Sequence, residues 1–189
     1  MRYNTIRSMD ISNGEKVGVA LFIQGCPHHC KNCFNPETWD FNGGKEWTKE
    51  IKDEFLKLVN RPYIKRVTLL GGSPLAKENL IDVLSLVDEI KTKFPDKTIW
   101  LYTGYDFNNI MHWTEEQYEI DVHNNFRLTN NEYLRQQIIS RCDVVIDGRF
   151  EEDKKDLSLR FRGSSNQRII DVQKSLKEGD IILWQQHTN

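Results

Sequence analysis

Residues 17–35 read VGVALFIQGCPHHCKNCFN, an apolar run followed directly by a cysteine-rich loop. The run Val17–Ile23 is almost entirely apolar and rich in β-branched and aromatic residues, which predicts a strand buried on both faces, as in parallel sheets. The loop then begins at the carboxyl end of that strand. Because ligands bind at the carboxyl ends of strands in α/β sheets and barrels, we expect the functional site here.

Three of the four cysteines of the chain, Cys26, Cys30 and Cys33, lie within eight residues, in the spacing C-x3-C-x2-C. Such crowding indicates a metal ion or a cluster, because three clustered cysteines cannot all pair as disulfides. A structural zinc ion would need a fourth ligand, for which His28 and His29 are candidates. A 4Fe–4S cluster would keep one iron without a protein ligand, open to a small molecule. The cysteines alone favour the cluster, and zinc remains the alternative.

Further short apolar runs along the chain predict more strands. The first three of them end in or near a glycine turn. They are Val67–Leu70, Ile99–Tyr102 and Cys142–Ile146, with short closing strands at Arg168–Val172 and Ile181–Trp184. Cys142, the fourth cysteine, opens an apolar run and is predicted to be a small buried residue.

Between these strands, apolar residues recur at helical spacing. One helix is predicted from an N-cap at Thr48 to about Asn60, a second over Ala76–Phe94 and a short third over Glu132–Ser140. The segment Met1–Lys16 is polar and turn-rich, with a turn expected at Asn13-Gly14. The polar segment 113–131 has no clear period, so we predict an insertion with little structure of its own.

The alternation of strands and helices predicts an α/β fold around a parallel sheet. A closed eight-stranded barrel takes about 250 residues, so a chain of 189 residues predicts an open, partial (βα) barrel. We expect a single domain over residues 1–189, with an insertion at about 113–131 and a C-terminal extension at about 170–189.

The composition suits an ordinary globular protein. Hydrophobic residues make up 38% and charged residues 29% of the chain, and the net charge of −2 gives no reason to expect nucleic-acid binding. The longest apolar run is too short to span a bilayer, and the first residues lack the apolar segment of a signal peptide. We therefore expect no membrane partner and a cytoplasmic location, where reducing conditions keep thiolates available.

The cysteine spacing, followed by the aromatic Phe34, is similar to the signature of radical S-adenosylmethionine enzymes. Other short motifs fall in the same order and narrow the resemblance to the activating enzymes of anaerobic ribonucleotide reductase. They are Asp10-Ile11 with Asn13-Gly14, Leu21-Phe22, Gly25-Cys26, Thr38-Trp39, Gly71-Gly72-Ser73-Pro74-Leu75, Thr103-Gly104-Tyr105 and Arg162-Gly163-Ser164-Ser165-Asn166-Gln167. The resemblance runs from about Ile6 to Gln167 and is looser between Trp113 and Gln137.

This resemblance implies both the cofactors and their ligands. Cys26, Cys30 and Cys33 would hold three irons of one 4Fe–4S cluster, and S-adenosylmethionine would chelate the fourth iron. Gly71, Gly72 and Ser73 would form the turn that binds the methionine end, where the family usually carries Asp or Glu in place of the serine. Asn32, Cys33 and Phe34 would lie beside the adenine. No side chain is expected to act as a general acid or base, because the cluster and cofactor supply the chemistry.

The resemblance also implies a function. The protein would cleave S-adenosylmethionine reductively at the cluster and abstract hydrogen from a glycine of anaerobic ribonucleoside-triphosphate reductase, leaving a glycyl radical. Its partners would be the glycine loop of that reductase and an electron donor such as flavodoxin. Two alternatives stay open, namely an activase of another glycyl radical enzyme of the pyruvate formate-lyase type and a non-enzymatic zinc or iron–sulfur binding module.

Overall fold

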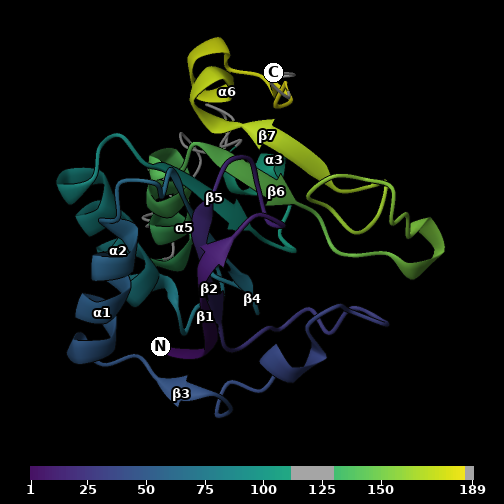
Figure 1. Cartoon of the computed structure of the whole chain (residues 1–189). Coiled ribbons are helices and arrows are strands. Elements are labelled where there is room, and N and C mark those ends of the chain that lie inside the picture. Colours follow the sequence, from purple (N-terminus) through teal and green to yellow (C-terminus); the bar gives the residue numbers. More distant parts are fainter. Residues whose placement is uncertain (112–129, 186–189) are drawn as a thin grey trace, which may run out of the picture.

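The computed structural model describes residues 1–111 and 130–185, and a seven-stranded sheet runs through the middle of the molecule (Figure 1). Across the sheet the strand order is β3-β1-β2-β4-β5-β6-β7. The strands are β1 (Arg2–Asp10), β2 (Gly18–Ile23), β3 (Lys45–Glu46), β4 (Arg66–Gly71), β5 (Thr98–Tyr102), β6 (Val144–Asp147) and β7 (Arg168–Asp171). The neighbours β2, β4, β5 and β6 pair in parallel, whereas β1, β3 and β7 pair antiparallel.

The main helices pack on one face of this sheet, to the left in Figure 1. The described α-helices are α1 (Lys49–Val59), α2 (Leu80–Lys93), α3 (Phe107–Met111), α5 (Asn130–Arg141) and α6 (Val172–Glu178), with short 3-10 turns at Pro36–Thr38 and Glu152–Lys154. The parallel strands follow one another in chain order, and crossovers between parallel strands are almost always right-handed. A strand order that always advances in one direction therefore places the connecting helices on the same side.

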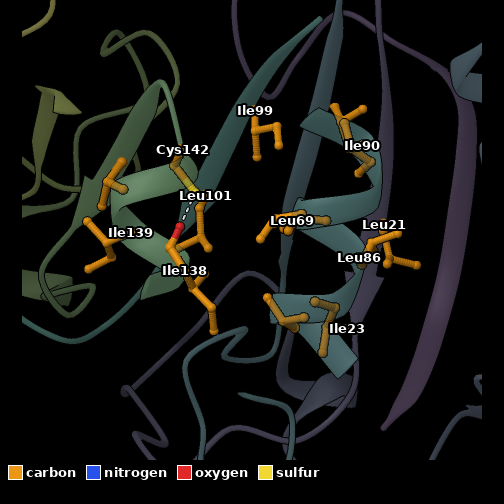
Figure 2. Packing of buried hydrophobic residues seen from close by; sticks show 14 of the residues in the cluster. Leu21, Ile23, Leu69, Leu86, Ile90, Ile99, Leu101, Ile138, Ile139 and Cys142 are labelled. Atoms are coloured by element: carbon orange, nitrogen blue, oxygen red, sulfur yellow. Dashed lines mark hydrogen bonds between the residues drawn. The ribbon is translucent and has the colours of Figure 1, made fainter. Parts of the chain in front are cut away.

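Alternate side chains of the parallel strands reach the helix-covered face and form the main core. Leu21 and Ile23 of β2, Leu69 of β4 and Leu101 of β5 meet apolar residues of α2 and α5 there (Figure 2). The intervening residues of the same strands face the other side of the sheet. There Phe22, Leu70 and Tyr102 form a small apolar cluster that no helix of the described chain covers. This second face is the one available for a ligand.

The sequence predicts the central elements well. Helix α1 begins at the expected N-cap, where the Thr48 hydroxyl accepts a hydrogen bond from the Ile51 amide. The predicted strands at Val67–Leu70 and Ile99–Tyr102 are confirmed within one residue as β4 and β5. Helix α2 starts at Leu80 instead of Ala76, because the carbonyls of Ser73 and Ala76 accept amide hydrogen bonds of tight turns before the helix begins.

The predicted parallel sheet is confirmed for its four central strands, but antiparallel strands, whose direction was not predicted from the sequence, flank it on both sides. Residues 1–16 were described as polar and turn-rich, yet β1 pairs with β2 over much of its length. Its sequence is polar because most of the strand is solvated and only its ends, Tyr3 and Asp10, are buried, so no apolar alternation marks it. The predicted strand at 168–172 is confirmed as β7, but it runs antiparallel to β6.

At the C-terminal end, the second predicted closing strand is also wrong. Leu183 makes one isolated bridge with Ile170, and the regular element nearby is the unpredicted helix α6. The carboxylate of Asp171 caps this helix by accepting from the Lys174 amide, and Gly179 ends it with a φ of 70°. The predicted insertion at 113–131 lies almost wholly outside the described residues.

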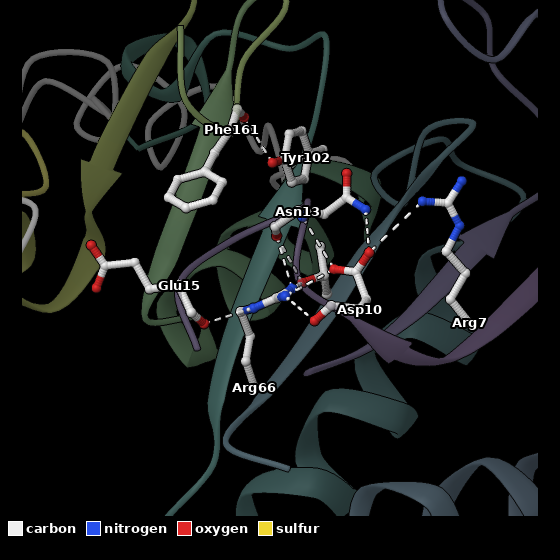
Figure 3. Close-up of polar contacts among 8 residues, drawn as sticks. Arg7, Asp10, Asn13, Glu15, Arg66, Tyr102 and Phe161 are labelled. Carbon is white, nitrogen blue, oxygen red and sulfur yellow. Dashed lines mark hydrogen bonds and ion pairs between the residues drawn. The ribbon is translucent and has the colours of Figure 1, made fainter. Parts of the chain in front are cut away.

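A buried ion pair anchors the chain on the helix-free face (Figure 3). Arg66 of β4 is fully buried, and its guanidinium donates to the carboxylate and the carbonyl of Asp10 at 2.8 and 3.0 Å. It also donates to the carbonyls of Asn13 and Glu15 and to the hydroxyl of Thr68. One guanidinium thus satisfies three backbone carbonyls of the turn between β1 and β2 and holds this turn against the sheet.

We predict that Arg66→Met lowers the free energy of unfolding by about 3–5 kcal/mol, because the buried Asp10 carboxylate would lose its buried cation and keep only the half-exposed Arg7 at 3.8 Å. The matched control is Lys49→Met, which removes an exposed ion pair with Asp53 and should change the stability by about 0.5 kcal/mol or less. Urea unfolding of the two variants measures both effects. Equal, small losses would show that the buried pair does not hold the turn.

Candidate active site

A cavity of about 530 Å³ opens at the carboxyl ends of the parallel strands. Its floor is the helix-free face of the sheet, through Phe22, Leu70 and Tyr102. Its rim contains the residues that directly follow the four parallel strands. These are Cys26 after β2, Gly71 and Gly72 at the end of β4, Thr103 and Gly104 after β5, and Gly148 after β6. The volume is typical of small-molecule and cofactor sites.

The start of the cysteine loop is fixed by backbone hydrogen bonds to the segment that returns past it. The amide of Gly25 donates to the Thr38 carbonyl at 2.8 Å, and the amide of Cys26 donates to the Trp39 carbonyl at 3.0 Å. Gly25 has a φ of 93°, and a β-carbon there would lie 2.2 Å from the Phe41 ring. Glycine is therefore required directly before the first cysteine.

All three clustered cysteines carry free, partly buried thiols and line the cavity. Burial raises the pKa of the Cys26 and Cys30 thiols, and repulsion among the thiolates raises both further. Bound iron cations would favour the thiolate form of these groups. Cys33 Sγ also accepts a hydrogen bond from the Asn35 amide at 3.4 Å. Three thiols on one loop facing a cavity of this size are a donor set that fits an iron–sulfur cluster.

The two histidines of the loop have packing roles. The His28 ring lies edge-on to Tyr105 at 4.6 Å and fills the space above Gly104, where a β-carbon would lie 2.5 Å from the imidazole. Burial, with Arg149 and Arg135 nearby, lowers the pKa of His28 to about 4, so the ring is neutral. The His29 ring stacks on Trp39 at 4.8 Å. Within the described residues, no three His, Cys, Asp or Glu side chains are grouped to hold a single metal ion.

The glycine turn after β4 lies against the cysteine loop. The Gly72 amide donates to the Ile23 carbonyl at 2.7 Å and the Ser73 amide to the Gly25 carbonyl at 2.8 Å. A β-carbon on Gly72 would lie 2.5 Å from that Gly25 oxygen. Gly71 and Gly72 line the cavity. Ser73 does not, and its buried hydroxyl has no hydrogen-bond partner among the described residues.

Of the remaining predicted site residues, Phe34 lies at the cavity and Asn32 does not. Phe34 lines the cavity and contacts the Phe150 ring edge-on at 5.1 Å. Gly163 makes room for it, because a β-carbon there would lie 2.5 Å from the Phe34 ring. The side chain of Asn32 instead donates to Glu152, so Asn32 connects the cysteine loop to the segment after β6 and does not line the cavity.

The motif at Arg162–Gln167 forms part of the cavity wall, through Arg162, Gly163 and Gln167. The Gln167 side chain accepts from the Gly163 and Ser164 amides at 2.9 and 3.3 Å and donates to the Gly148 carbonyl at 3.1 Å. The Arg162–Gln167 motif stood out in the sequence because it is dense in hydrogen-bond donors. The role of its individual residues did not follow from the sequence. Arg7, which lies 4.6 Å above the Phe22 ring inside the cavity, was missed because β1 carries no motif.

Comparisons with known proteins agree with this geometry. Residues 12–170 match the family of 4Fe–4S single cluster domains. The chain is 36% identical over 171 residues to the anaerobic ribonucleoside-triphosphate reductase-activating protein of Salmonella typhi, and 35% identical over 171 residues to that of Escherichia coli K12. Both alignments cover 89% of this chain and 97% of the relative. The protein of the same name from Enterobacteria phage T4 is 33% identical over 169 residues, with 89% and 93% covered.

The chain belongs to the family of anaerobic ribonucleoside-triphosphate reductase-activating proteins. The family assignment confirms the resemblance drawn from the cysteines and from Arg162–Gln167. The matched 4Fe–4S domain includes all three clustered cysteines, the glycine turn and the cavity wall. Among the described residues, no helix combines the length and apolar character needed to cross a membrane.

We predict that Gly72→Ala destabilises the protein by about 2–3 kcal/mol, because its methyl group would press on backbone of the cysteine loop. Gly179→Ala is the matched control. Gly179 has a φ of 70° with nothing within 4 Å of a β-carbon, so only backbone strain of about 1 kcal/mol is expected. Urea unfolding gives both values. A smaller loss for Gly72→Ala than for Gly179→Ala would contradict the close approach of turn and loop.

Proposed function

We propose that this protein activates an anaerobic ribonucleoside-triphosphate reductase by converting one of its glycines to a glycyl radical. One observation carries the proposal: the three cysteines and the glycine turn meet at a single cavity on the carboxyl edge of the parallel strands. The relatives that bear the activating-protein name match along nearly their whole length, and this favours reductase activation over activation of a pyruvate formate-lyase type of enzyme.

Cys26, Cys30 and Cys33 would hold one 4Fe–4S cluster, as their shared position on the cavity supports. S-adenosylmethionine would bind beside it, with its methionine end at Gly71 and Gly72. When bound, the cluster and S-adenosylmethionine supply the electron and the radical chemistry that remove a hydrogen atom from the glycine. The three-thiolate set fits this pairing because it leaves one iron for a small-molecule ligand.

The other residues predicted to contact S-adenosylmethionine differ in whether they line the cavity. Phe34 would pack against the adenine together with Cys33, and the position of both residues on the cavity supports this. We assign Asn32 the task of tying the cysteine loop to Glu152 near that group. Ser73 would contribute through the backbone of the turn, because its buried side chain does not line the cavity. Its neutral side chain cannot replace the charge of an acidic residue, so backbone groups of the turn would carry more of the binding.

This chain's own residues would keep water away from the reaction. Phe22, Leu70 and Tyr102 make the cavity floor apolar, and the phenol of Tyr102 is tied to the Phe161 carbonyl at 2.7 Å. The mouth remains open, with Phe34 52% and Leu157 76% exposed. We propose that the glycine loop of the reductase closes this mouth, because a reactive radical needs a site sealed from solvent.

The arrangement of strands supports an open, partial (βα) barrel made by the whole chain as one domain. The parallel strands advance in chain order, the helices lie outside, and the cavity lies inside, as in a closed barrel with strands missing. Arg149, Arg160 and Arg162 lie on the segment after β6 and would steer the reductase to the opening. An electron donor such as flavodoxin and a cytoplasmic location complete the proposal.

Anaerobic incubation of the reconstituted protein with reductase from the same genome, S-adenosylmethionine and a reductant tests this function. Electron paramagnetic resonance should show a radical whose hyperfine splitting changes when the reductase carries labelled glycine. Cys30→Ala should lose the signal together with its iron, whereas Cys142→Ala should keep both, since Cys142 is buried in the main core away from the cavity. A full signal from Cys30→Ala, or a signal insensitive to the label, would disprove the proposal.

A further inference from the structure

Asn79 occupies an unusual position between the cysteine loop and the glycine turn. It is the residue directly before helix α2, where an Asn side chain ordinarily accepts a hydrogen bond from the first turn of the helix. Here it makes no such cap. Its side-chain amide instead donates to the Gln24 carbonyl at 3.1 Å and to the Ser73 carbonyl at 3.0 Å.

These two carbonyls belong to the two parts of the proposed cofactor site. Gln24 lies two residues before Cys26, and Ser73 directly follows the glycine pair. Asn79 is almost completely buried, as are both of its partners, so water does not compete for the carbonyls. The side chain therefore bridges the entry of the cysteine loop and the glycine turn at the point where the pairing of β2 and β4 has ended.

Gln24 extends the same bridge to the far side of the cysteine loop. Its buried side-chain amide donates to the carbonyls of Glu37 and Asp40 at 2.9 and 2.8 Å. Two buried amides, Asn79 and Gln24, thus hold the loop entry from the turn on one side and from the returning chain on the other. Asn79 makes this connection in place of a helix cap, although a cap commonly stabilises a helix by about 1 kcal/mol.

We infer that Asn79 is a positioning residue that sets the separation between the first cluster ligand, Cys26, and the Gly71–Ser73 turn. The inference rests on the proposed function, because it assumes that S-adenosylmethionine spans from the cluster to this turn. Without the two donors, the buried carbonyls of Gln24 and Ser73 would lose their shared partner. Only the backbone hydrogen bonds from the Gly72 and Ser73 amides would then hold the turn against the loop, so their separation would be less strictly fixed. Affinity for a ligand that needs both parts at once would fall.

The decisive variant is Asn79→Asp, which keeps the shape of the side chain and removes both donors. Gln173 supplies a control with the same hydrogen-bond pattern at an exposed position, since its side-chain amide also bridges two carbonyls, those of Ser140 and Cys142, outside the cavity. Gln173→Glu therefore also removes two side-chain hydrogen-bond donors, but at a position that should not affect the site. Asn79→Ser, which keeps one donor, is a milder variant for use if the aspartate does not fold.

The experiment measures the dissociation constant of S-adenosylmethionine for the reconstituted holoproteins, without reductase. We expect it to rise about tenfold or more in Asn79→Asp, partly in Asn79→Ser, and not in Gln173→Glu, with the same iron content in all three holoproteins. The melting temperature falls further in Asn79→Asp than in the control, because position 79 is buried and Gln173 is exposed. Unchanged affinity in a folded Asn79 variant overturns the positioning role alone. No binding by the unaltered protein overturns the proposed function as well, so the two failures are distinguishable.

Discussion

The handedness of the crossovers is the constraint on which the rest of the structure depends. The four parallel strands follow one another in chain order, so right-handed connections place α1, α2 and α5 on one face of the sheet. The opposite face receives only the alternate side chains and the loops. That asymmetry leaves a cavity at the strand ends, where in a doubly wound sheet a second layer of helices would lie. The position of the proposed cofactor site is therefore determined first by the strand order and only then by individual residues.

Polar contacts complete the face that helices do not cover. Arg66 closes the amino-terminal side of this face by binding the turn after β1, and Gln167 closes the carboxyl side by gathering the backbone of residues 148 and 163–164. Both use one side chain to satisfy several backbone groups of a loop, so that irregular chain can lie over the sheet. Asn79 makes the same kind of connection between the two halves of the proposed site.

Sequence alone was sufficient for the parts where local chemistry decides the structure. The cysteine loop, the strand before it and the Thr48 cap each carry a distinct pattern, and each lies where it was predicted. The solvated strand β1 and the edge strand β7 depend on pairing partners distant in sequence, so no local pattern reveals their direction. Asn79 looked like an ordinary residue within a helix, because its role requires knowing that Gln24 and Ser73 come together.

The central claim is that three thiolates hold a four-iron cluster and leave one iron to S-adenosylmethionine. Mössbauer spectroscopy of the anaerobically reconstituted, 57Fe-labelled protein tests it most directly, because this method distinguishes iron sites within one cluster. The account predicts about four irons per chain, one of which changes its spectrum when S-adenosylmethionine is added. Four irons that do not respond to S-adenosylmethionine, or stoichiometric zinc in place of iron, would contradict it.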